Sequence, residues 1–312
     1  MRTAAPKDSI LDLGVEVGPL HLKNPVLAAS GTFGYGQEFE EVVALSRLGG
    51  IVTKAVTLEP RLGNPPPRIV ETAAGMLNSI GLANVGVEAF VRDKMPFLRS
   101  CGTAVIVNVA GRTVEEYAQT ARRLDDCPGI HALEINISCP NVKEGGLSFG
   151  ADPQLAGQVV EAIRNVTPLP LIAKLTPNVT DVAAIAEAVQ EAGADAVSLI
   201  NTLVGMAIDV ERRRPKLGGV TGGLSGPAIK PVALAMVWKV AQAVQIPVIG
   251  IGGIASAEDA LEFLITGAVA VQVGTANFVD PTSTIQIIEG LERYVRAKGY
   301  RSPREIVGTL EV

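Results

Sequence analysis

A cysteine surrounded by amides is the most chemically suggestive feature of the sequence. The run NISCPN at residues 136–141 places Cys139 between two asparagines, and Gly145–Gly146 follow closely. An isolated free cysteine is more often a small buried apolar residue than a reactive group. Here the neighbouring amides, proline and glycines favour a thiol carried over a ligand, where it can act as a general base. Neither histidine competes for that role, because His21 precedes the first predicted strand and His131 opens the fourth.

Two glycine clusters predict a phosphate site. IGIGG ends in Gly252 and Gly253, and VQVGT contains Gly274 and Thr275. Glycine lets backbone N–H groups approach a phosphate, and the loops after strands seven and eight of an α/β barrel commonly hold one. One glycine turn would indicate only a tight bend. Two of them after neighbouring strands favour phosphate binding.

Lysines and asparagines supply the remaining polar groups. Lys54 and Lys174 each lie in an apolar, strand-like run. A buried lysine is costly unless it is paired, although a lysine at a strand end can also extend into solvent. Two ammonium groups near the cysteine would stabilise electron density on a bound heterocycle and an acidic substrate. Asparagines at strand ends or in adjoining loops add amides that suit a planar ring: Asn78, Asn108, Asn136 and Asn201.

The elements that must position these residues follow a regular alternation. Short β-branched runs predict strands at 25–30, 50–56, 103–109, 131–137, 170–176, 195–201, 247–252 and 269–275. Helical patterns follow them at 38–49, 87–100, 113–126, 152–166, 181–193, 230–244, 256–267 and 281–298. Alternating strands and helices of this kind predict parallel βαβ units, and eight of them favour a (β/α)8 TIM barrel. We expect one domain over residues 1–312, with a small N-terminal hairpin at about 11–23.

Long loops interrupt this alternation after strands 2, 4 and 6. They cover residues 57–86, the cysteine segment that follows strand 4, and residues 202–226. All follow the carboxyl ends of predicted strands, where barrel enzymes build their sites. We therefore expect them to shape the site.

Composition excludes several classes of protein. Hydrophobic residues make up 47% of the chain and charged residues 19%, which predicts a substantial core. The net charge of −5 and the lack of a basic arm speak against nucleic acid as a partner. The apolar runs are of strand length, so we expect no membrane segment. The three cysteines, Cys101, Cys127 and Cys139, show neither metal spacing nor a disulfide framework, which predicts a cytoplasmic protein without its own metal site.

The motifs resemble those of the class 1 dihydroorotate dehydrogenases of pyrimidine biosynthesis, from about Leu13 to Pro281. The matching pieces are ASGTFG (29–34), TKAVTLEPRLGNPPPR (53–68), NSIGLANVG (78–86), NVAG (108–111), EINISCPNVKEGG (134–146), LINT (199–202), GGLSGPAIKP (222–231) and IGIGGI (249–254). The cysteine is typical of class 1. The related class 2 enzymes use serine as the base and carry an N-terminal membrane-binding extension, which we do not expect here.

The resemblance implies a role for each matching position. One FMN per chain would contact Ser30, Lys54, Ala55, Asn108, Asn136, Lys174, Ile200, Gly226, Gly252, Gly253, Gly274 and Thr275. The substrate, (S)-dihydroorotate, would contact Lys54, Asn78, Ser79, Ile80, Gly81, Leu82, Asn136, Asn201 and Thr202. Cys139 would be the base that removes the C5 proton while hydride leaves C6 for FMN, which yields orotate.

Residues 57–90 look most like the 1B subtype. Its catalytic subunits pair with a second subunit that carries FAD and a [2Fe–2S] cluster, in a heterotetramer of two catalytic and two partner chains, and pass electrons to NAD+. The 78–84 segment reads NSIGLAN where NAIGLQN would be expected, so its pocket contacts differ in detail.

Three alternatives stay open at this point. A 1A-type enzyme would be a homodimer that reduces fumarate. A flavin barrel resembling a dihydrouridine synthase would act on another reduced pyrimidine and would need an RNA-binding surface. A flavin-free barrel would merely bind a phosphorylated metabolite.

Overall fold

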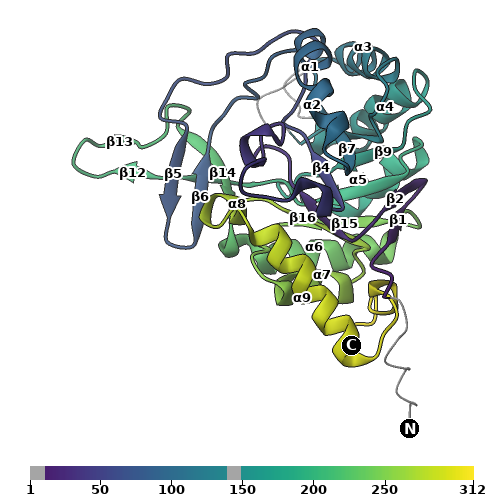
Figure 1. Ribbon diagram of the computed structural model, residues 1–312. Coiled ribbons are helices and arrows are strands. Elements are labelled where there is room, and N and C mark those ends of the chain that lie inside the picture. Colours follow the sequence, from purple (N-terminus) through teal and green to yellow (C-terminus); the bar gives the residue numbers. More distant parts are fainter. Residues whose placement is uncertain (1–10, 139–148) are drawn as a thin grey trace.

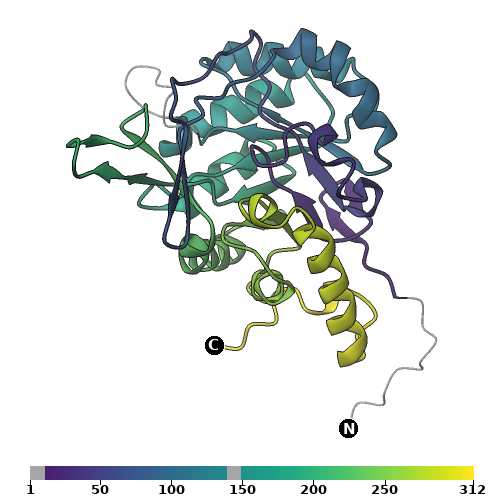
Figure 2. The ribbon, with the colours of Figure 1, turned by 60° about the vertical axis from the view of Figure 1, so that its left-hand side comes forward.

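A closed barrel of parallel strands forms the centre of the computed structural model, which describes residues 11–138 and 149–312. Figures 1 and 2 show the strands enclosed by helices. The strands, in chain order and in their order around the barrel, are β3 (Val26–Ala28), β4 (Gly50–Val52), β7 (Ala104–Val109), β8 (Ala132–Asn136), β9 (Leu171–Lys174), β10 (Ala196–Leu199), β15 (Val248–Ile251) and β16 (Ala270–Val273). Parallel pairing of β16 with β3 closes the ring, so the predicted (β/α)8 barrel is confirmed.

The helices cover the outside of the barrel. They are α1 (Val87–Asp93), α2 (Met95–Ser100), α3 (Val114–Asp125), α4 (Pro153–Arg164), α5 (Val182–Glu191), α6 (Lys230–Ala243), α7 (Ala257–Ile265), the short α8 (Ala276–Val279) and α9 (Ser283–Lys298). Several start at a side-chain cap, as α7 does where Ser256 and Asp259 form a reciprocal capping box. None of the helices in the described ranges is both long and apolar enough to span a membrane.

Side-chain alternation divides each barrel strand between two environments. On β8, Leu133 and Ile135 belong to the apolar layer between strands and helices, whereas Ala132 belongs to the barrel interior. Glu134 and Asn136 share the interior face of Ala132, because side chains two residues apart point the same way. The lower interior is therefore apolar and the upper interior is polar.

The predicted N-terminal hairpin closes the barrel floor. It consists of β1 (Val15–Val17) and β2 (Leu20–Leu22), which pair antiparallel. Its apolar side chains form one buried cluster with interior residues such as Leu27, Val52 and Ile172. The hairpin thus excludes water from the end opposite the predicted site.

The two long insertions meet in a second sheet. β5 (Ile69–Thr72) and β6 (Gly75–Asn78) come from the first insertion, and β11 (Leu203–Met206) and β14 (Thr221–Ser225) come from the second. The sheet order is β11-β14-β6-β5, and a small ribbon of β12 (Ile208–Asp209) and β13 (Arg214–Pro215) extends from it (Figure 1). These insertions were predicted as loops, so their strand content and mutual pairing correct that expectation.

The helix predicted at 38–49 is wrong. The segment instead contains two short 3-10 turns, η1 (Gln37–Phe39) and η2 (Leu45–Arg47). Gly36 before the first turn is left-handed, and Leu48 after the second is extended. Gly49 lies against the Asn24 backbone, where a side chain would not fit. Helix propensity is a weak preference, and here the packing of Val43, Leu45 and Leu48 into the core overrides it.

Candidate active site

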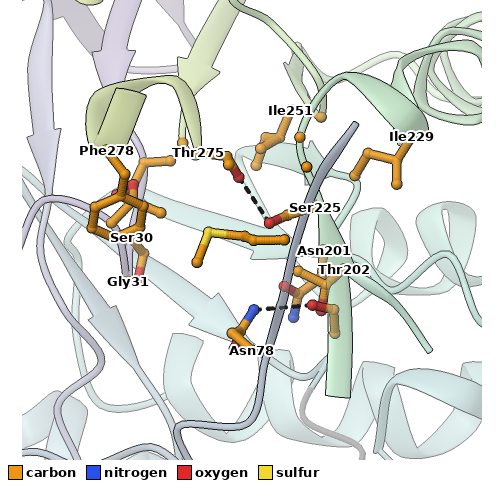
Figure 3. A pocket seen from close by; sticks show the side chains of 18 of the residues that line it. Ser30, Gly31, Asn78, Asn201, Thr202, Ser225, Ile229, Ile251, Thr275 and Phe278 are labelled. Atoms are coloured by element: carbon orange, nitrogen blue, oxygen red, sulfur yellow. Dashed lines mark hydrogen bonds between the residues drawn. The ribbon is translucent and has the colours of Figure 1, made fainter. Parts of the chain in front are cut away.

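A large cavity opens at the carboxyl ends of the barrel strands, with a volume of about 1450 Å³. The insertion sheet forms one wall, and the segments after β3 and β16 form another (Figure 3). Ser30, Thr275 and Phe278 lie on one side of the view in Figure 3, and Asn78, Asn201 and Thr202 lie on the other. The cavity therefore lies at the barrel face that the sequence predicted.

The structure brings nearly all the predicted binding residues together. Those that line the cavity are Ser30, Lys54, Ala55, Asn78, Ser79, Ile80, Gly81, Leu82, Asn136, Lys174, Ile200, Asn201, Thr202, Gly226, Gly252, Gly253, Gly274 and Thr275. Asn108 differs, because it is fully buried behind the wall and its Oδ1 accepts a hydrogen bond from Asn136 Nδ2 at 3.3 Å. Cys139 lies outside the described residues.

The two lysines have different surroundings. Lys174 ends β9, its side chain is 7% exposed, and its Nζ lies 3.6 Å from Glu134 Oε2. Lys54 follows β4 and is half-buried on the cavity wall. Within the described ranges, no carboxylate forms an ion pair with the Lys54 ammonium. Lys54 is thus the lysine whose charge is available to an anionic ligand.

The predicted phosphate glycines are needed for two different reasons. Gly252 and Gly253 have φ values of 129° and 74°, and added Cβ atoms would meet Ala233 and Lys230 at 2.9 and 2.7 Å. These glycines are required by the fold itself. At Gly274 an added Cβ would meet nothing closer than 3.7 Å, and the backbone is not left-handed. Because neither packing nor conformation requires glycine there, Gly274 leaves its backbone open to close approach by a ligand.

The first insertion presents its polar groups from a fixed loop. Asn84 holds the loop through its side chain, whose Oδ1 accepts from Gly86 N at 2.8 Å and whose Nδ2 donates to Thr57 Oγ1 at 2.8 Å. Asn78 lies at the end of β6 and donates to the Gly223 carbonyl of β14 at 3.2 Å. Ser79, where the expected motif has alanine, accepts a hydrogen bond from Asn64 Nδ2 at 2.8 Å. The serine is therefore accommodated by this loop's own neighbours.

The other candidate acid–base groups lie elsewhere. Cys101 and Cys127 are buried away from the cavity, and burial, followed by the charge of Glu40, raises the pKa of the Cys101 thiol to about 11. His21 and His131 line a smaller depression at the opposite end of the barrel. The described residues thus bring neither these thiols nor the histidines to the cavity.

Sequence reasoning missed two residues around the site. Glu134 is fully buried directly below the cavity and accepts hydrogen bonds from several strands. The ALEIN alternation could have revealed it, because residues 132, 134 and 136 share one face of the strand. Ser225 lines the cavity and accepts from Thr275 Oγ1 at 2.8 Å, a contact drawn in Figure 3. It lies in the insertion strand β14, which the sequence did not predict.

Comparison with known proteins decides the family. The sequence model described as dihydroorotate dehydrogenase matches residues 12–295. The chain belongs to the dihydroorotate dehydrogenase family. A protein of Geotalea uraniireducens is 59% identical over 299 residues, which cover 96% of this chain and 98% of the relative. A protein of Geobacter sulfurreducens is 60% identical over 301 residues, which cover 96% and 99%. Both are named dihydroorotate dehydrogenase B (NAD(+)), catalytic subunit, so the predicted resemblance to the 1B subtype is confirmed.

Proposed function

We propose that this dihydroorotate dehydrogenase uses bound FMN to oxidise (S)-dihydroorotate to orotate, a step of pyrimidine biosynthesis, and passes the electrons through a partner subunit to NAD+. The observation that carries the proposal is the convergence of the family's motif positions on one cavity within a chain that matches the family over residues 12–295. Relatives named as B-type catalytic subunits favour this function over the fumarate-dependent alternative.

The cavity fits FMN by the chemistry of its donors. Gly274 leaves backbone accessible where no packing demands it, and the Thr275 hydroxyl lies beside it, a combination that suits a phosphate. Lys174 and Asn136 offer a charge and an amide from the cavity floor, which suit the ring. Ser30, Ala55, Ile200, Gly226, Gly252 and Gly253 complete the lining assigned to FMN.

The substrate residues lie on the insertion side of the same cavity. Lys54 would bind the carboxylate of dihydroorotate, because its ammonium has no ion-pair partner among the described residues. Asn78, Asn136 and Asn201 supply amides to the ring, and Thr202 adds a hydroxyl. Residues 79–82 line the cavity beside these groups. Such fixed contacts align the reacting carbon with the base.

Cys139 is the proposed base. Its thiolate takes the proton from C5 of dihydroorotate, and the C5–C6 double bond forms as hydride leaves C6. Bound FMN supplies the acceptor for that hydride. Lys54 and the asparagines hold the ring in place while the proton moves to the Cys139 sulfur.

A partner subunit is supported by the relatives' names and by the cavity mouth. Phe278 and Val279 line the cavity, yet they are 53% and 85% exposed. Exposed apolar side chains grouped beside a redox site are typical of a protein interface. We propose a heterotetramer of two catalytic and two partner chains, in which the partner carries FAD and a [2Fe–2S] cluster.

Copurification tests this function. The chain should be expressed alone and together with the products of its neighbouring genes, and orotate formation should be followed with NAD+ and with an artificial dye as acceptor. We expect FMN in both preparations, dye reduction by both, and NAD+ reduction only by the complex. A colourless protein that takes up no FMN would contradict the proposal, and rapid NAD+ reduction by the chain alone would contradict the partner.

A cysteine variant tests the base. Cys139→Ala should bind FMN normally, but mixing with dihydroorotate in a stopped-flow instrument should reduce the flavin at least a hundredfold more slowly, because general-base catalysis commonly contributes factors of that size. Cys127→Ala is the matched control and should reduce at the wild-type rate. A normal rate for Cys139→Ala would remove it from the mechanism.

A further inference from the structure

The barrel interior below the cavity contains a carboxylate that the proposed mechanism does not use. Glu134 lies in the middle of β8 with no exposed surface. At this depth the interior of such barrels is usually filled by branched apolar side chains. A buried carboxylate is costly unless its oxygens are satisfied. Its retention below a binding site calls for a functional reason.

Donors from four other strands converge on Glu134. Its Oε1 accepts from Gln272 Nε2 of β16 at 2.6 Å and from Ser198 Oγ of β10 at 3.0 Å. Its Oε2 accepts from Asn108 Nδ2 of β7 at 2.6 Å and lies 3.6 Å from the Lys174 ammonium of β9. The carboxylate therefore links two residues assigned to FMN, Asn108 and Lys174, which lie on the strands either side of β8.

We propose that Glu134 is a positioning residue that fixes which atoms the cavity floor presents to its ligand. An ionised carboxylate only accepts hydrogen bonds, so Asn108 must direct its NH₂ group toward Glu134. Its Oδ1 then faces Asn136 and accepts from Asn136 Nδ2 at 3.3 Å. Asn136 is thereby forced to direct its own Oδ1 away from Asn108.

These hydrogen bonds from Glu134 through Asn108 to Asn136 form a relay. At its end, the Asn136 Oδ1 is an acceptor for the ligand. Asn136 lines the cavity, and its Oδ1 is buried without a hydrogen-bond partner in the part of the chain that the structure describes. A buried acceptor needs a donor, and an N–H of the proposed substrate's ring would supply one. A ligand that presents only carbonyl oxygens at this point would be rejected. This inference rests on the proposed function, because it takes the ligand to be an amide-bearing heterocycle.

Glu134 also partly offsets the positive charge of Lys174. The two groups form a buried pair of opposite charge, with side chains that are 0% and 7% exposed. Without the carboxylate, the Lys174 ammonium would act on the cavity at full strength. A stronger positive charge stabilises a reduced anionic flavin, so the flavin midpoint potential should become more positive.

The test uses the complex of the catalytic chain with its partner, loaded with FMN. Glu134→Gln removes the charge. Because glutamine can donate to Asn108 Oδ1, the two asparagine amides can turn over, so that Asn136 presents Nδ2 in place of Oδ1 to the ligand. Asn108→Ala breaks the relay but keeps the Glu134–Lys174 pair. Ser198→Ala is the matched control, since it removes one contact to Glu134 and keeps both the charge and the relay. Orotate affinity is measured from the change it causes in flavin absorbance, and the midpoint potential by dye equilibration.

Each variant has its own expected pattern. Glu134→Gln should weaken orotate binding about tenfold or more and make the potential more positive. Asn108→Ala should weaken orotate binding to a similar extent with little change in potential. Ser198→Ala should match the wild type in both measurements. Glu134→Asp, which retains the charge, should recover most of the wild-type potential.

Two results would overturn the proposal. Wild-type affinity and potential in Glu134→Gln would show that the network serves stability alone. If that variant does not fold, wild-type orotate affinity in Asn108→Ala would exclude the relay. Failure of the proposed function is distinguishable, because the wild-type complex would then show no orotate-dependent change in flavin absorbance.

Discussion

At the scale of single residues, the two lysines of the cavity differ in how far their charge is offset by a carboxylate. Lys174 is held beside Glu134 on the cavity floor, whereas Lys54 follows β4 without an ion-pair partner among the described residues. An unpaired, half-buried ammonium is the stronger attractor for an anion, because no neighbouring carboxylate offsets its charge. Lys54 should therefore contribute more than Lys174 to binding the substrate carboxylate.

The variant Lys54→Gln tests this division. It keeps a donor of similar length but removes the charge, and a hydrogen bond to a charged group contributes about 1.5–3 kcal/mol. Orotate should therefore bind about ten to a hundred times more weakly, as measured by titration of the flavin absorbance. Lys239→Gln is the control, because Lys239 pairs with Asp181 at the surface. Equal affinities in the two variants would contradict the role of Lys54.

The cavity residues could be predicted from the sequence because they follow strand ends. Parallel strands of a barrel bring all their carboxyl ends to one face, so any polar residue at that position becomes a candidate. Glu134 was not predicted as a site residue because it lies inside a strand, two residues before the end of β8. Its hydrogen bonds come from Asn108, Ser198 and Gln272 on other strands, and only the closed structure reveals that these side chains meet.

At the scale of elements, the sheet that the two insertions form (β11-β14-β6-β5) holds proposed substrate residues in place through backbone pairing. β6 brings Asn78 to the cavity and pairs with β14, which carries Ser225. Gly75 begins β6 with a φ of 153°, and an added Cβ would collide with the Ser225 carbonyl oxygen. A side chain at this position would therefore separate the two insertions.

The variant Gly75→Ala should disturb the site more than the barrel. We expect orotate affinity to fall at least tenfold, with faster amide hydrogen exchange in β6 and β14 and little change in the barrel strands. Gly157→Ala is the control, because this glycine lies in α4 and an added Cβ would meet nothing closer than 3.6 Å. It should be neutral or slightly stabilising, since alanine favours a helix by about 1 kcal/mol over glycine. Unchanged orotate affinity in Gly75→Ala would show that orotate binding does not depend on the pairing of β6 with β14.

The elements also show where prediction from sequence ends. Buried parallel strands were predicted well, because continuous β-branched runs between helical patterns have few other interpretations. Pairing of β6 with β14 joins segments that are more than a hundred residues apart, and short runs containing several glycines give little β signal. The 38–49 segment failed for the opposite reason, because its helical pattern was present but core packing determined another path.

At the scale of the whole molecule, the two ends of the described chain hold each other. Asp12 N donates to the Arg301 carbonyl at 3.1 Å, and Arg304 Nε donates to the Gly14 carbonyl at 2.7 Å. The C-terminal segment thus fastens the hairpin that closes the barrel floor, while β16 and β3 close its wall. We propose that the chain is one domain, in which ligand binding at the cavity stabilises the hairpin, the barrel and the outer helices together.

Ligand-linked unfolding tests this proposal. Trp238, the single tryptophan, lies on α6 outside the barrel and is a local probe, whereas far-UV circular dichroism reports on the whole backbone. For the FMN-loaded chain in urea, orotate at a hundred times its Kd should raise the free energy of unfolding by about 2.7 kcal/mol. Because one domain shares that energy, both probes should show the same increment. In Lys54→Gln the same orotate concentration should give a clearly smaller increment by both. If orotate raises the free energy of unfolding measured by circular dichroism but not the one measured by Trp238 fluorescence, α6 belongs to a separately unfolding unit.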